Sequence, residues 1–392
     1  MKHFRLPSGI PLVLVGLMTL AGCSLLSPPV KVATPPAPVE PPKPVYVPPI
    51  DTHKFEIDPQ HDDVIGVVQV TVTSKHDTLP DIARRFNVGY EEIVRANPGV
   101  DVWLPGAGRE IVVPTQFVLP SAPREGVVIN VAAMRIFYFP PAKKGEKQVV
   151  YTHPIGIGKV GWSTPEGATK VVSKQKDPVW NPPASVRAEH KANGEILPKV
   201  VPAGPDNPLG KYKFTLGWPS YLIHGTNKPY GVGLRSSHGC IRLYPEDVEK
   251  LFGMIGPGTP VRVVNQPFVF GWHGDQMYLQ AYDVLEDDKR DWSKAQPKLL
   301  SKTLTPRIQA ELKASGGTVN WARVAEITKD PRGLALSVSS VEQDIAAVIK
   351  AAPRVENRVP EGANWDGADD PALQAQTDVE VMVTEQQQAP RT

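Results

Sequence analysis

Proline restricts the fold of this chain more than any other residue, because 43 of its 392 residues are proline, about twice the usual share of roughly 5%. Ten of these prolines lie between Ser27 and Ile50, where apolar residues show almost no periodicity. Such a segment cannot bury a core, and polyproline II geometry would extend it by about 3.1 Å per residue, roughly 70 Å in all. We therefore expect residues 23–50 to form a semi-rigid linker.

The residues before this linker indicate export. A positively charged start is followed by an apolar run over residues 10–20 and by the sequence LAGC, which ends at Cys23 and matches a bacterial lipoprotein cleavage site. The run is shorter than the roughly 20 residues of a membrane-spanning helix, so a permanent transmembrane anchor is disfavoured. We expect residues 1–22 to be a signal peptide, and Cys23 to carry acyl chains that anchor the protein to a membrane. Ser24 in place of aspartate favours the outer membrane, with the protein on its inner, periplasmic leaflet.

Cysteine usage singles out one thiol. The chain has two cysteines, and lipidation of Cys23 leaves Cys240 with no partner inside the chain. An unpaired thiol in an oxidising compartment is a liability unless it is used, although a buried inert thiol or a disulfide to another chain are alternatives. The net charge of +2, with 21% charged residues, gives no reason to expect a nucleic-acid partner.

A small module precedes the main domain, over residues 68–115. The sequence QVTVT alternates like a strand, residues 79–86 and 90–96 have the apolar spacing of helices, and REIVVP has the composition of a second strand. This βααβ pattern resembles a LysM module through DTLPDIARRFNV, EEIVRANPGV and IVVP. The resemblance implies binding to glycan strands of peptidoglycan. An accessory module without glycan affinity remains the alternative, because Lys75-His76-Asp77 replaces the usual glycine-containing turn.

Residues 126–265 form the main domain, which we expect to be mainly β. VVINVAAMRIFYF and KQVVYTHPIGIG have the pattern of paired strands, TPVRVV that of another, and helix signals are few. One helix is clear after Tyr244, because Pro245 suits the first helical position and an apolar face follows it up to Gly256.

Two further segments follow the main domain. Residues 266–355 contain FVFGWHGDQMYLQAYDV, which starts at Phe268 and which we expect to pack on the main domain. They also contain amphipathic helical segments near 306–314 and 337–351. Residues 356–392 have the composition of a disordered tail. The sequence suggests no function for either segment.

Residues 156–161 match the dinucleotide-binding pattern GxGxxG and follow a strand, but the context disfavours a nucleotide site. Trp162-Ser163-Thr164-Pro165 follows, so no helix can open there to hold a pyrophosphate. We expect these glycines to let the backbone turn tightly beside a cleft.

The stretch from Tyr221 to Leu243 has the residues needed for acyl transfer by cysteine. A free thiol has a pKa near 8.5, so a nucleophilic cysteine needs an imidazole within hydrogen-bond reach. Both His224 and His238 offer one, and the glycine-rich loop between two short strands can bring His224 to Cys240. Amides near Gly239 and Cys240 could donate to an oxyanion. A zinc site is disfavoured, because no second ligand pair stands out and residues one apart on a strand face opposite sides.

The same stretch carries a family resemblance. HGTNKPYGVGLRSSHGCIRL, which begins at His224, resembles the signature of the YkuD-type L,D-transpeptidase catalytic domain, in which a histidine precedes an SHGC or THGC block. PIGIGKVGWSTPEG, DPVWNPPASVRAEH and VVPAGPDNPLGKY resemble segments of the Gram-negative periplasmic members. The resemblance covers residues 127–265 and implies a YkuD-like β-sandwich with one or two short helices. We expect no cofactor and no metal.

The resemblance also implies roles for individual residues. Cys240 would be the nucleophile, and His224 the base, oriented by the carbonyl of Gly225. His238 and Gly239 would complete the catalytic block, although a structural role for His238 is an alternative and the residues alone leave open which imidazole is the base. The substrate-binding residues implied by the matching segments are Ser237, Arg242, Arg187 and Trp180.

The family's chemistry implies a thioester between Cys240 and a peptidoglycan tetrapeptide stem, resolved by an amine. The expected acceptor is the C-terminal lysine of an outer-membrane lipoprotein. The alternatives are a diaminopimelate amine, which gives a 3-3 cross-link, and water. A glycan-binding lipoprotein without catalysis is the alternative of another class, and the joint presence of His224, His238 and Cys240 argues against it.

Overall fold

The computed structural model describes residues 45–58, 61–142, 146–292, 304, 306–315, 319–339 and 344–358. The expected signal peptide, the lipidation site Cys23 and most of the linker lie outside the described residues. Among the helices of the described ranges, none is both long and apolar enough to cross a membrane.

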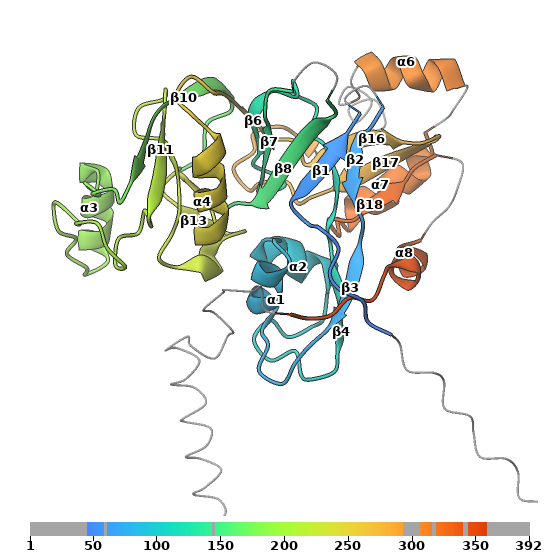
Figure 1. The fold of residues 1–392 in the computed structure, drawn as a ribbon, viewed down its shortest axis with the longest axis horizontal. Helices are drawn as coiled ribbons and strands as arrows, with labels where there is room; N and C mark the ends of the chain where they lie inside the picture. The colour runs from blue at the N-terminus through green and yellow to red at the C-terminus, as the bar shows by residue number, and fades with distance from the viewer. Residues whose placement is uncertain are drawn as a thin grey trace, which may run out of the picture. The chain divides into compact units, whose positions relative to one another are not determined.

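The largest element is a mixed sheet of nine strands. From one edge to the other its order is β1 (Lys54–Ile57), β8 (Gln148–Pro154), β7 (Arg135–Phe139), β6 (Gly126–Asn130), β15 (Pro260–Val264), β10 (Gly167–Lys176), β11 (Tyr212–Leu216), β12 (Leu222–His224) and β14 (Ile241–Arg242). β6, β7 and β8 form an antiparallel meander (Figure 1), whereas β15 with β6 and β12 with β14 pair in parallel. The edge strand β1 comes from before residue 126, so the sheet includes a strand from outside the expected main domain.

The middle of this sheet and its β14 end contribute to one hydrophobic core. Its members include Val127, Ile129, Val261 and Val263 from the central strands β6 and β15, Phe214, Ile223 and Ile241 from β11, β12 and β14, and Val248 and Leu251 from helix α4 (Pro245–Met254). The expected sandwich thus takes the form of one continuous sheet whose central strands and β14 end share a core with α4. The expectation of a mainly β fold with one or two short helices is confirmed: α3 (Ala184–Ala192) and α4 are the α-helices described within residues 126–265.

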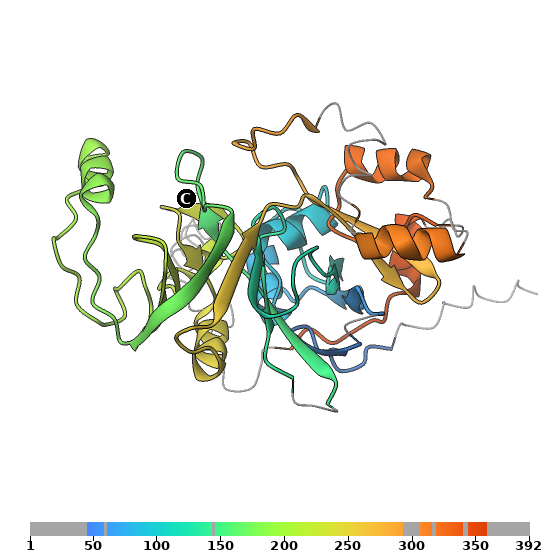
Figure 2. The ribbon, with the colours of Figure 1, turned by 90° about the horizontal axis from the view of Figure 1, so that it is seen from above.

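Two connections of this sheet bear on function. Residues 177–211 leave the sheet between β10 and β11 and carry α3 at their tip (Figures 1 and 2). The GxGxxG stretch lies at β9 (Ile157–Gly158), which pairs in parallel with β13 (Arg235–Ser237). No helix opens between Gly161 and β10, as expected from the sequence Trp162-Ser163-Thr164-Pro165. Gly158 allows a close approach, because a Cβ there would lie 1.8 Å from the Trp162 carbonyl oxygen.

The segment that resembles a LysM module contains the expected strand, two helices and strand. They are β3 (Gln69–Val72), α1 (Leu79–Arg85), α2 (Tyr90–Ala96) and β4 (Glu110–Val113), with β3 antiparallel to β4. Thr78 and Asp81 form a capping box that satisfies two amides at the start of α1, and Leu79, Ile82 and Ile93 are fully buried. A second small sheet, β2 (Val64–Gly66) with β5 (Gln116–Val118), adjoins the module in sequence on both sides.

A buried ion pair joins this module to the main sheet. Arg135 on β7 is 0% exposed, and its Nε and Nη2 each donate to the Glu92 carboxylate of α2 at 2.8 Å. The guanidinium also stacks over Phe117 at 3.8 Å and donates to the Asn87 carbonyl at 3.0 Å. Removing one partner of such a pair lowers the free energy of unfolding by about 3–5 kcal/mol, because the other charge stays buried without a partner. The module is therefore attached rigidly at this point.

The residues after the main domain form a further sheet with helices beside it. β16 (Phe268–His273) and β17 (Gln276–Ala281) form a hairpin, and the helices are α6 (Pro306–Ser315), α7 (Trp321–Lys329) and α8 (Ile345–Ala351). The expectation of a helix from residue 337 is wrong, because β18 (Ala335–Ser337) pairs with β17 and α8 begins only at Ile345. These strand residues are buried against an otherwise open edge of β17, and that burial outweighs local helix preference.

The C-terminal end of the described chain returns to the LysM-like module. Arg354 pairs with Val70 of β3, and Val355 pairs with Val47 from the linker. Asn357 donates to the Val72 carbonyl at 3.0 Å and to the Asp77 carboxylate at 2.6 Å. Residues 356 and 357 therefore do not belong to a disordered tail, because the Glu356 amide donates to the Val47 carbonyl at 2.8 Å and the Asn357 side chain is bonded to the module. Linker residues 45–50 are likewise part of the folded body.

Candidate active site

Cys240 lies directly before β14, with its side chain half-buried. The thiol donates to the Ser220 carbonyl at 3.6 Å. Burial raises the pKa of this thiol, while the Leu222 amide and the Arg242 charge lower it less. The resting group is therefore a neutral thiol that needs a base before it can attack.

His224 ends β12 and is 4% exposed. Its Nδ1 lies 2.6 Å from the Gly225 carbonyl oxygen, which can only accept, so Nδ1 carries the proton and donates it. Nε2 is left with a lone pair. Burial first, and then the Arg242 charge, lower the pKa of His224 to about 3, so the imidazole is neutral at any ordinary pH. A neutral imidazole with a free Nε2 is what a general base requires.

The strand register puts these two groups on one face of the sheet. In the parallel pair β12–β14, Ile223 lies opposite Ile241 and His224 opposite Arg242. Cys240 is therefore level with Leu222, two residues along from His224 and on its face, because side chains alternate along a strand. Both isoleucines are 1% exposed, so a slip by one residue would expose them and is disfavoured.

The Cys240 thiol makes its hydrogen bond to a carbonyl and not to an imidazole. Across the described ranges, no hydrogen bond joins Cys240 to either His224 or His238. Hydrogen bonds of catalytic groups often shorten only when substrate binds.

The His238 side chain contacts α3. Its Nε2 lies 3.1 Å from a carboxylate oxygen of Glu189 on α3, and its ring meets Trp162 edge-on at 4.9 Å. Burial and the Lys159 charge lower the pKa of His238, and Glu189 opposes them. Because this ring nitrogen is already engaged, the geometry favours His224 as the base, and a positioning role for His238 stays open.

The turn before the nucleophile depends on Gly239. Its φ of +97° is a backbone conformation that favours glycine, and a Cβ added at this position would lie 2.9 Å from the Tyr221 ring. The Gly239 amide donates to Ser237 Oγ at 3.1 Å, and that hydroxyl donates to the Cys240 carbonyl at 2.6 Å. Ser237 thus holds the turn. It also occupies one of the two amides that the sequence offered to an oxyanion.

Arg242 lies on the same face of β14 as Cys240. One of its terminal nitrogens donates to Ser236 Oγ at 3.1 Å. Its Nε is buried and has no hydrogen-bond partner within the described part of the chain. Its positive charge is near enough to lower the pKa of the thiol, so Arg242 can stabilise negative charge that develops during attack.

Two other predicted substrate residues lie on the 177–211 excursion. Arg187 in α3 donates to the Pro182 carbonyl, and Trp180 pairs through its backbone with Val201. For the residues that the structure covers, neither side chain has an interaction with Cys240 or His224. Their role in binding substrate stays a prediction.

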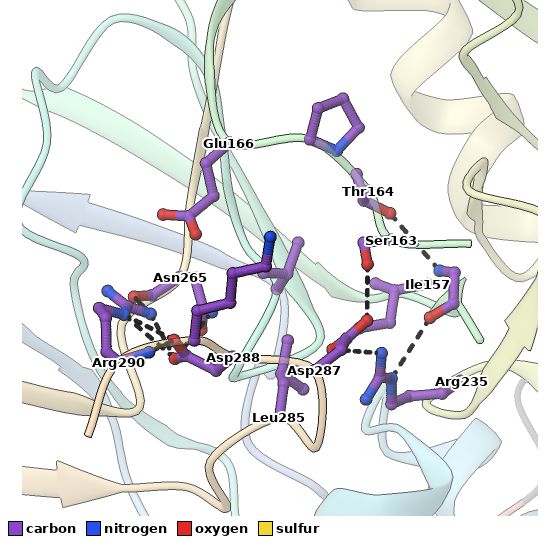
Figure 3. Close-up of a pocket in the computed structure, with 14 residues that line it drawn as sticks. Ile157, Ser163, Thr164, Glu166, Arg235, Asn265, Leu285, Asp287, Asp288 and Arg290 are labelled. Atoms are coloured by element: carbon purple, nitrogen blue, oxygen red, sulfur yellow. Dashed lines mark hydrogen bonds and ion pairs between the residues drawn. The ribbon is translucent and has the colours of Figure 1, made fainter. Parts of the chain in front are cut away.

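The sequence did not predict a set of hydrogen bonds that links a residue outside the main domain, Asp287, to the segments beside the catalytic turn. Asp287 follows β17 and accepts from Ser163 Oγ at 2.6 Å and from Arg235 at 2.7 Å (Figure 3). Thr164, which follows Ser163 in the chain, donates to the Gly239 carbonyl at 3.0 Å. No periodicity or motif marks Asp287, because its role depends on where the chain returns after β17.

The LysM-like module is hydrogen-bonded to the loop between His224 and Cys240. The first two amides of α2, those of Tyr90 and Glu91, donate to the carbonyls of Val232 and Gly233 at 3.1 and 3.2 Å. These carbonyls lie in the glycine-rich loop between His224 and Cys240, which also contains the 3-10 turn η1 (Pro229–Gly231). The loop's conformation is therefore held by residues distant in sequence.

The fold and site together define a thiol acyltransferase, with a neutral thiol and a neutral buried histidine on adjacent parallel strands. In the described ranges, His, Cys, Asp and Glu side chains form no group of three that could hold a metal ion.

Comparison with known proteins identifies the family. Residues 124–263 match the model of the YkuD L,D-transpeptidase catalytic domain. The probable L,D-transpeptidase ErfK/SrfK of Salmonella typhimurium is 37% identical over 73% of this chain and 91% of its own length. The probable L,D-transpeptidases YcfS and YbiS of Escherichia coli are 42% and 40% identical, over 59% and 63% of this chain and 72% and 79% of theirs. The chain belongs to the YkuD-type L,D-transpeptidase family, whose members are cysteine transpeptidases, and this membership implies peptidoglycan as the substrate.

A solved relative is also similar. The catalytic domain of an Enterococcus faecium L,D-transpeptidase aligns with 37% of this chain and 99% of its own length, at 24% identity and a TM-score of 0.27. That score is too low to support a structural argument.

Proposed function

We propose that Cys240 attacks the carbonyl at the L-centre of diaminopimelate in a tetrapeptide stem and expels D-alanine. The shared face of Cys240 and His224, with Nδ1 of His224 tied to Gly225, carries this proposal. His224 takes the thiol proton as the sulfur attacks and passes it to the leaving amine. The stem is then held as a thioester on Cys240.

The acceptor that we propose for this thioester is the C-terminal lysine of an outer-membrane lipoprotein. The support is the likeness of residues 154–167, 177–190 and 200–212 to the Gram-negative segments. Transfer to that amine would tether the membrane to the wall. A diaminopimelate amine, which would give a 3-3 cross-link, and water are the competing acceptors.

The LysM-like module and the N-terminus supply the proposed location. We infer that the module binds glycan strands, supported by its βααβ order and by the exposed Trp103, whose ring lies 6.4 Å from that of Tyr90. Exposed aromatic rings can stack on sugars. Lipid on Cys23 would hold the enzyme at the periplasmic face of the outer membrane.

The decisive experiment compares wild type with Cys240→Ala. We expect a carbapenem to add one acyl group to the folded wild-type chain, detected by mass spectrometry, and none to the variant. Transfer should be abolished in Cys240→Ala, while binding to purified peptidoglycan persists. Transfer by the variant at the wild-type rate would show that the nucleophile is assigned wrongly.

Muropeptide analysis identifies the acceptor. Muropeptides from cells with and without this protein are separated by chromatography, and their masses are measured by mass spectrometry. Loss of lipoprotein-linked stems in the deletion supports the proposed acceptor, whereas loss of 3-3 dimers alone contradicts it.

A further inference from the structure

Helix α3 is carried at the tip of the 177–211 excursion (Figures 1 and 2), and this excursion is held together mainly by its own residues. Trp180 and Val201 exchange two backbone hydrogen bonds, at 2.9 and 2.8 Å. The Asn207 side chain donates to the Pro178 carbonyl at 2.9 Å. The position of α3 beside the active site therefore depends on the few contacts that it makes with the rest of the chain.

Glu189 supplies the polar contacts between α3 and the catalytic turn. One of its carboxylate oxygens faces the Lys159 ammonium in the loop after β9, and the other lies 3.1 Å from Nε2 of His238. Within the described part of the chain, no other hydrogen bond or ion pair joins residues 184–192 to residues outside the excursion. The His190 ring adds a contact, with its centre 6.0 Å from that of His238. A single carboxylate thus links α3 to two other segments.

The His238 ring is fixed by its neighbours. Because a carboxylate oxygen can only accept, Nε2 of His238 carries the proton that it donates to Glu189. Trp162 meets the ring edge-on at 4.9 Å. Cys240 follows two residues later, so the contacts that fix His238 also bear on the turn that presents the thiol.

The charges around His238 act on it in opposite directions. The titratable groups facing the ring are Lys159 from the loop after β9 and Glu189 and His190 from α3. Burial and the Lys159 charge lower the pKa of His238, Glu189 raises it, and His190 lowers it. The hydrogen bond from Lys159 in turn lowers the pKa of Glu189, which keeps this group a carboxylate. Loss of Glu189 and loss of Lys159 should therefore move the pKa of His238 in opposite directions.

We propose that Glu189 is a positioning residue for the transpeptidase reaction: by binding Lys159 and His238 together, it fixes α3 beside the catalytic turn and holds that turn in the conformation from which Cys240 attacks. The proposal rests on the thioester chemistry above and adds a residue to it. Glu189 acts through His238 and not on the thiol, whose pKa is shifted by burial, the Leu222 amide and Arg242. Its loss should therefore slow acylation without changing the reactivity of the thiol itself.

NMR titration of His238 in the full-length protein, labelled at histidine, tests the contact. The His238 signals are those that His238→Asn lacks. We expect Glu189→Gln to lower the pKa of His238, because the charge that favours the protonated ring is gone, and Lys159→Met to raise it. Asp206→Asn is the matched control, at an exposed carboxylate of the same excursion, and should leave the titration unchanged.

Two reactions of Cys240 test the effect on function. Glu189→Gln should slow acylation by a carbapenem about two- to fivefold, as for a partly exposed ion pair, while iodoacetamide labels the thiol at the wild-type rate. Asp206→Asn should match wild type in both reactions. An unchanged pKa of His238 in Glu189→Gln, acylation of that variant at the wild-type rate, or equal slowing of both reactions would overturn the proposal. If wild-type Cys240 forms no acyl adduct, it is the thioester chemistry that fails, and the titration still reports on Glu189.

Discussion

At the scale of single residues, the resting site is a neutral pair and not an ion pair. Burial raises the pKa of the Cys240 thiol and lowers that of the His224 imidazole, so proton transfer between them is unfavourable before substrate binds. Charge develops only as the sulfur attacks. Arg242 is the cation near enough to stabilise that charge, because its guanidinium lies on the same face of the strand.

We expect Arg242→Gln to slow alkylation of Cys240 by iodoacetamide. Arg242 lowers the pKa of the thiol, so its removal raises that pKa and leaves less thiolate at any pH below it. The pH profile of labelling in wild type should rise above the free-thiol pKa of about 8.5, and the variant's should lie higher still. At pH 8 the variant should label several-fold more slowly.

Arg187→Gln is the matched control for this experiment. It removes the same charge from α3, where the guanidinium contacts the Pro182 carbonyl. Its labelling profile should follow wild type. A wild-type profile in Arg242→Gln would show that this charge does not act on the thiol.

At the scale of elements, two close contacts hold the loop between the catalytic histidine and cysteine. Gly233 has a φ of +84°, and a Cβ there would lie 2.2 Å from the Tyr90 nitrogen of α2. The β17 end of the chain reaches the same region through Asp287. The catalytic loop is therefore positioned from both sides by other elements.

Gly233→Ala should destabilise the protein and lower its activity together. The new methyl group must push α2 from the loop and adopt a backbone conformation that alanine disfavours, which we expect to cost about 1–3 kcal/mol. Gly253→Ala is the control, since Gly253 lies in α4 with open space around it and alanine should add about 0.5–1 kcal/mol of helix stability. Thermal unfolding and carbapenem acylation measure both effects. Unchanged stability in Gly233→Ala would contradict the close contact.

Asp287→Ala and Ser163→Ala should both slow acyl-enzyme formation, because each removes one partner of the hydrogen bond from Ser163 Oγ to the Asp287 carboxylate, and Ser163 precedes Thr164, which donates to the Gly239 carbonyl. The two changes share one contact, so their effects on the rate should be non-additive by about 1 kcal/mol in a double-mutant cycle. Stopped-flow acylation by a carbapenem gives the four rates. Strict additivity would mean that Asp287 does not act through Ser163.

At the scale of the whole molecule, both ends of the described chain complete other parts of it. β1 forms one edge of the nine-stranded sheet, and Arg354 pairs with Val70 in the sheet of the LysM-like module. Thr71 donates to the Val355 carbonyl at 2.9 Å, and Asn357 holds the Asp77 turn. Asp77 also accepts from the Ser74 amide and pairs with Arg85, so this turn, which lacks glycine, is held by a buried carboxylate.

A chain that ends after Ala352 should therefore be less stable than one that ends after Arg358. The shorter chain loses the backbone bonds between Val70 and residues 353 and 355 and the side-chain bonds of Thr71 and Asn357. At about 1 kcal/mol net for each, the difference should be on the order of 4 kcal/mol. Urea unfolding of the two purified chains measures it. Equal midpoints would mean that this segment contributes nothing to stability.

Much of this molecule could be predicted from local sequence. Alternating and helical periodicities located β6, β7, β8 and β15 of the main domain, the βααβ module and α4, because burial of one face leaves a regular pattern, whereas β10 and β11 were not predicted. The HGC block identified Cys240 with its two histidines, because their chemistry needs those residue types close together. The strand at residues 335–337 could not be predicted, because its conformation depends on pairing with a distant edge.

The sequence by itself determined the family, the nucleophile and its candidate bases, and the order of most elements, because these depend on residue type and short-range spacing. Only the tertiary structure decided that the β12–β14 register puts His224 and Cys240 on one face and that His238 turns to Glu189. It also decided that Asp287 and α2 hold the loop between His224 and Cys240 in place. These features depend on contacts between residues far apart in the chain, which packing creates and local pattern does not record.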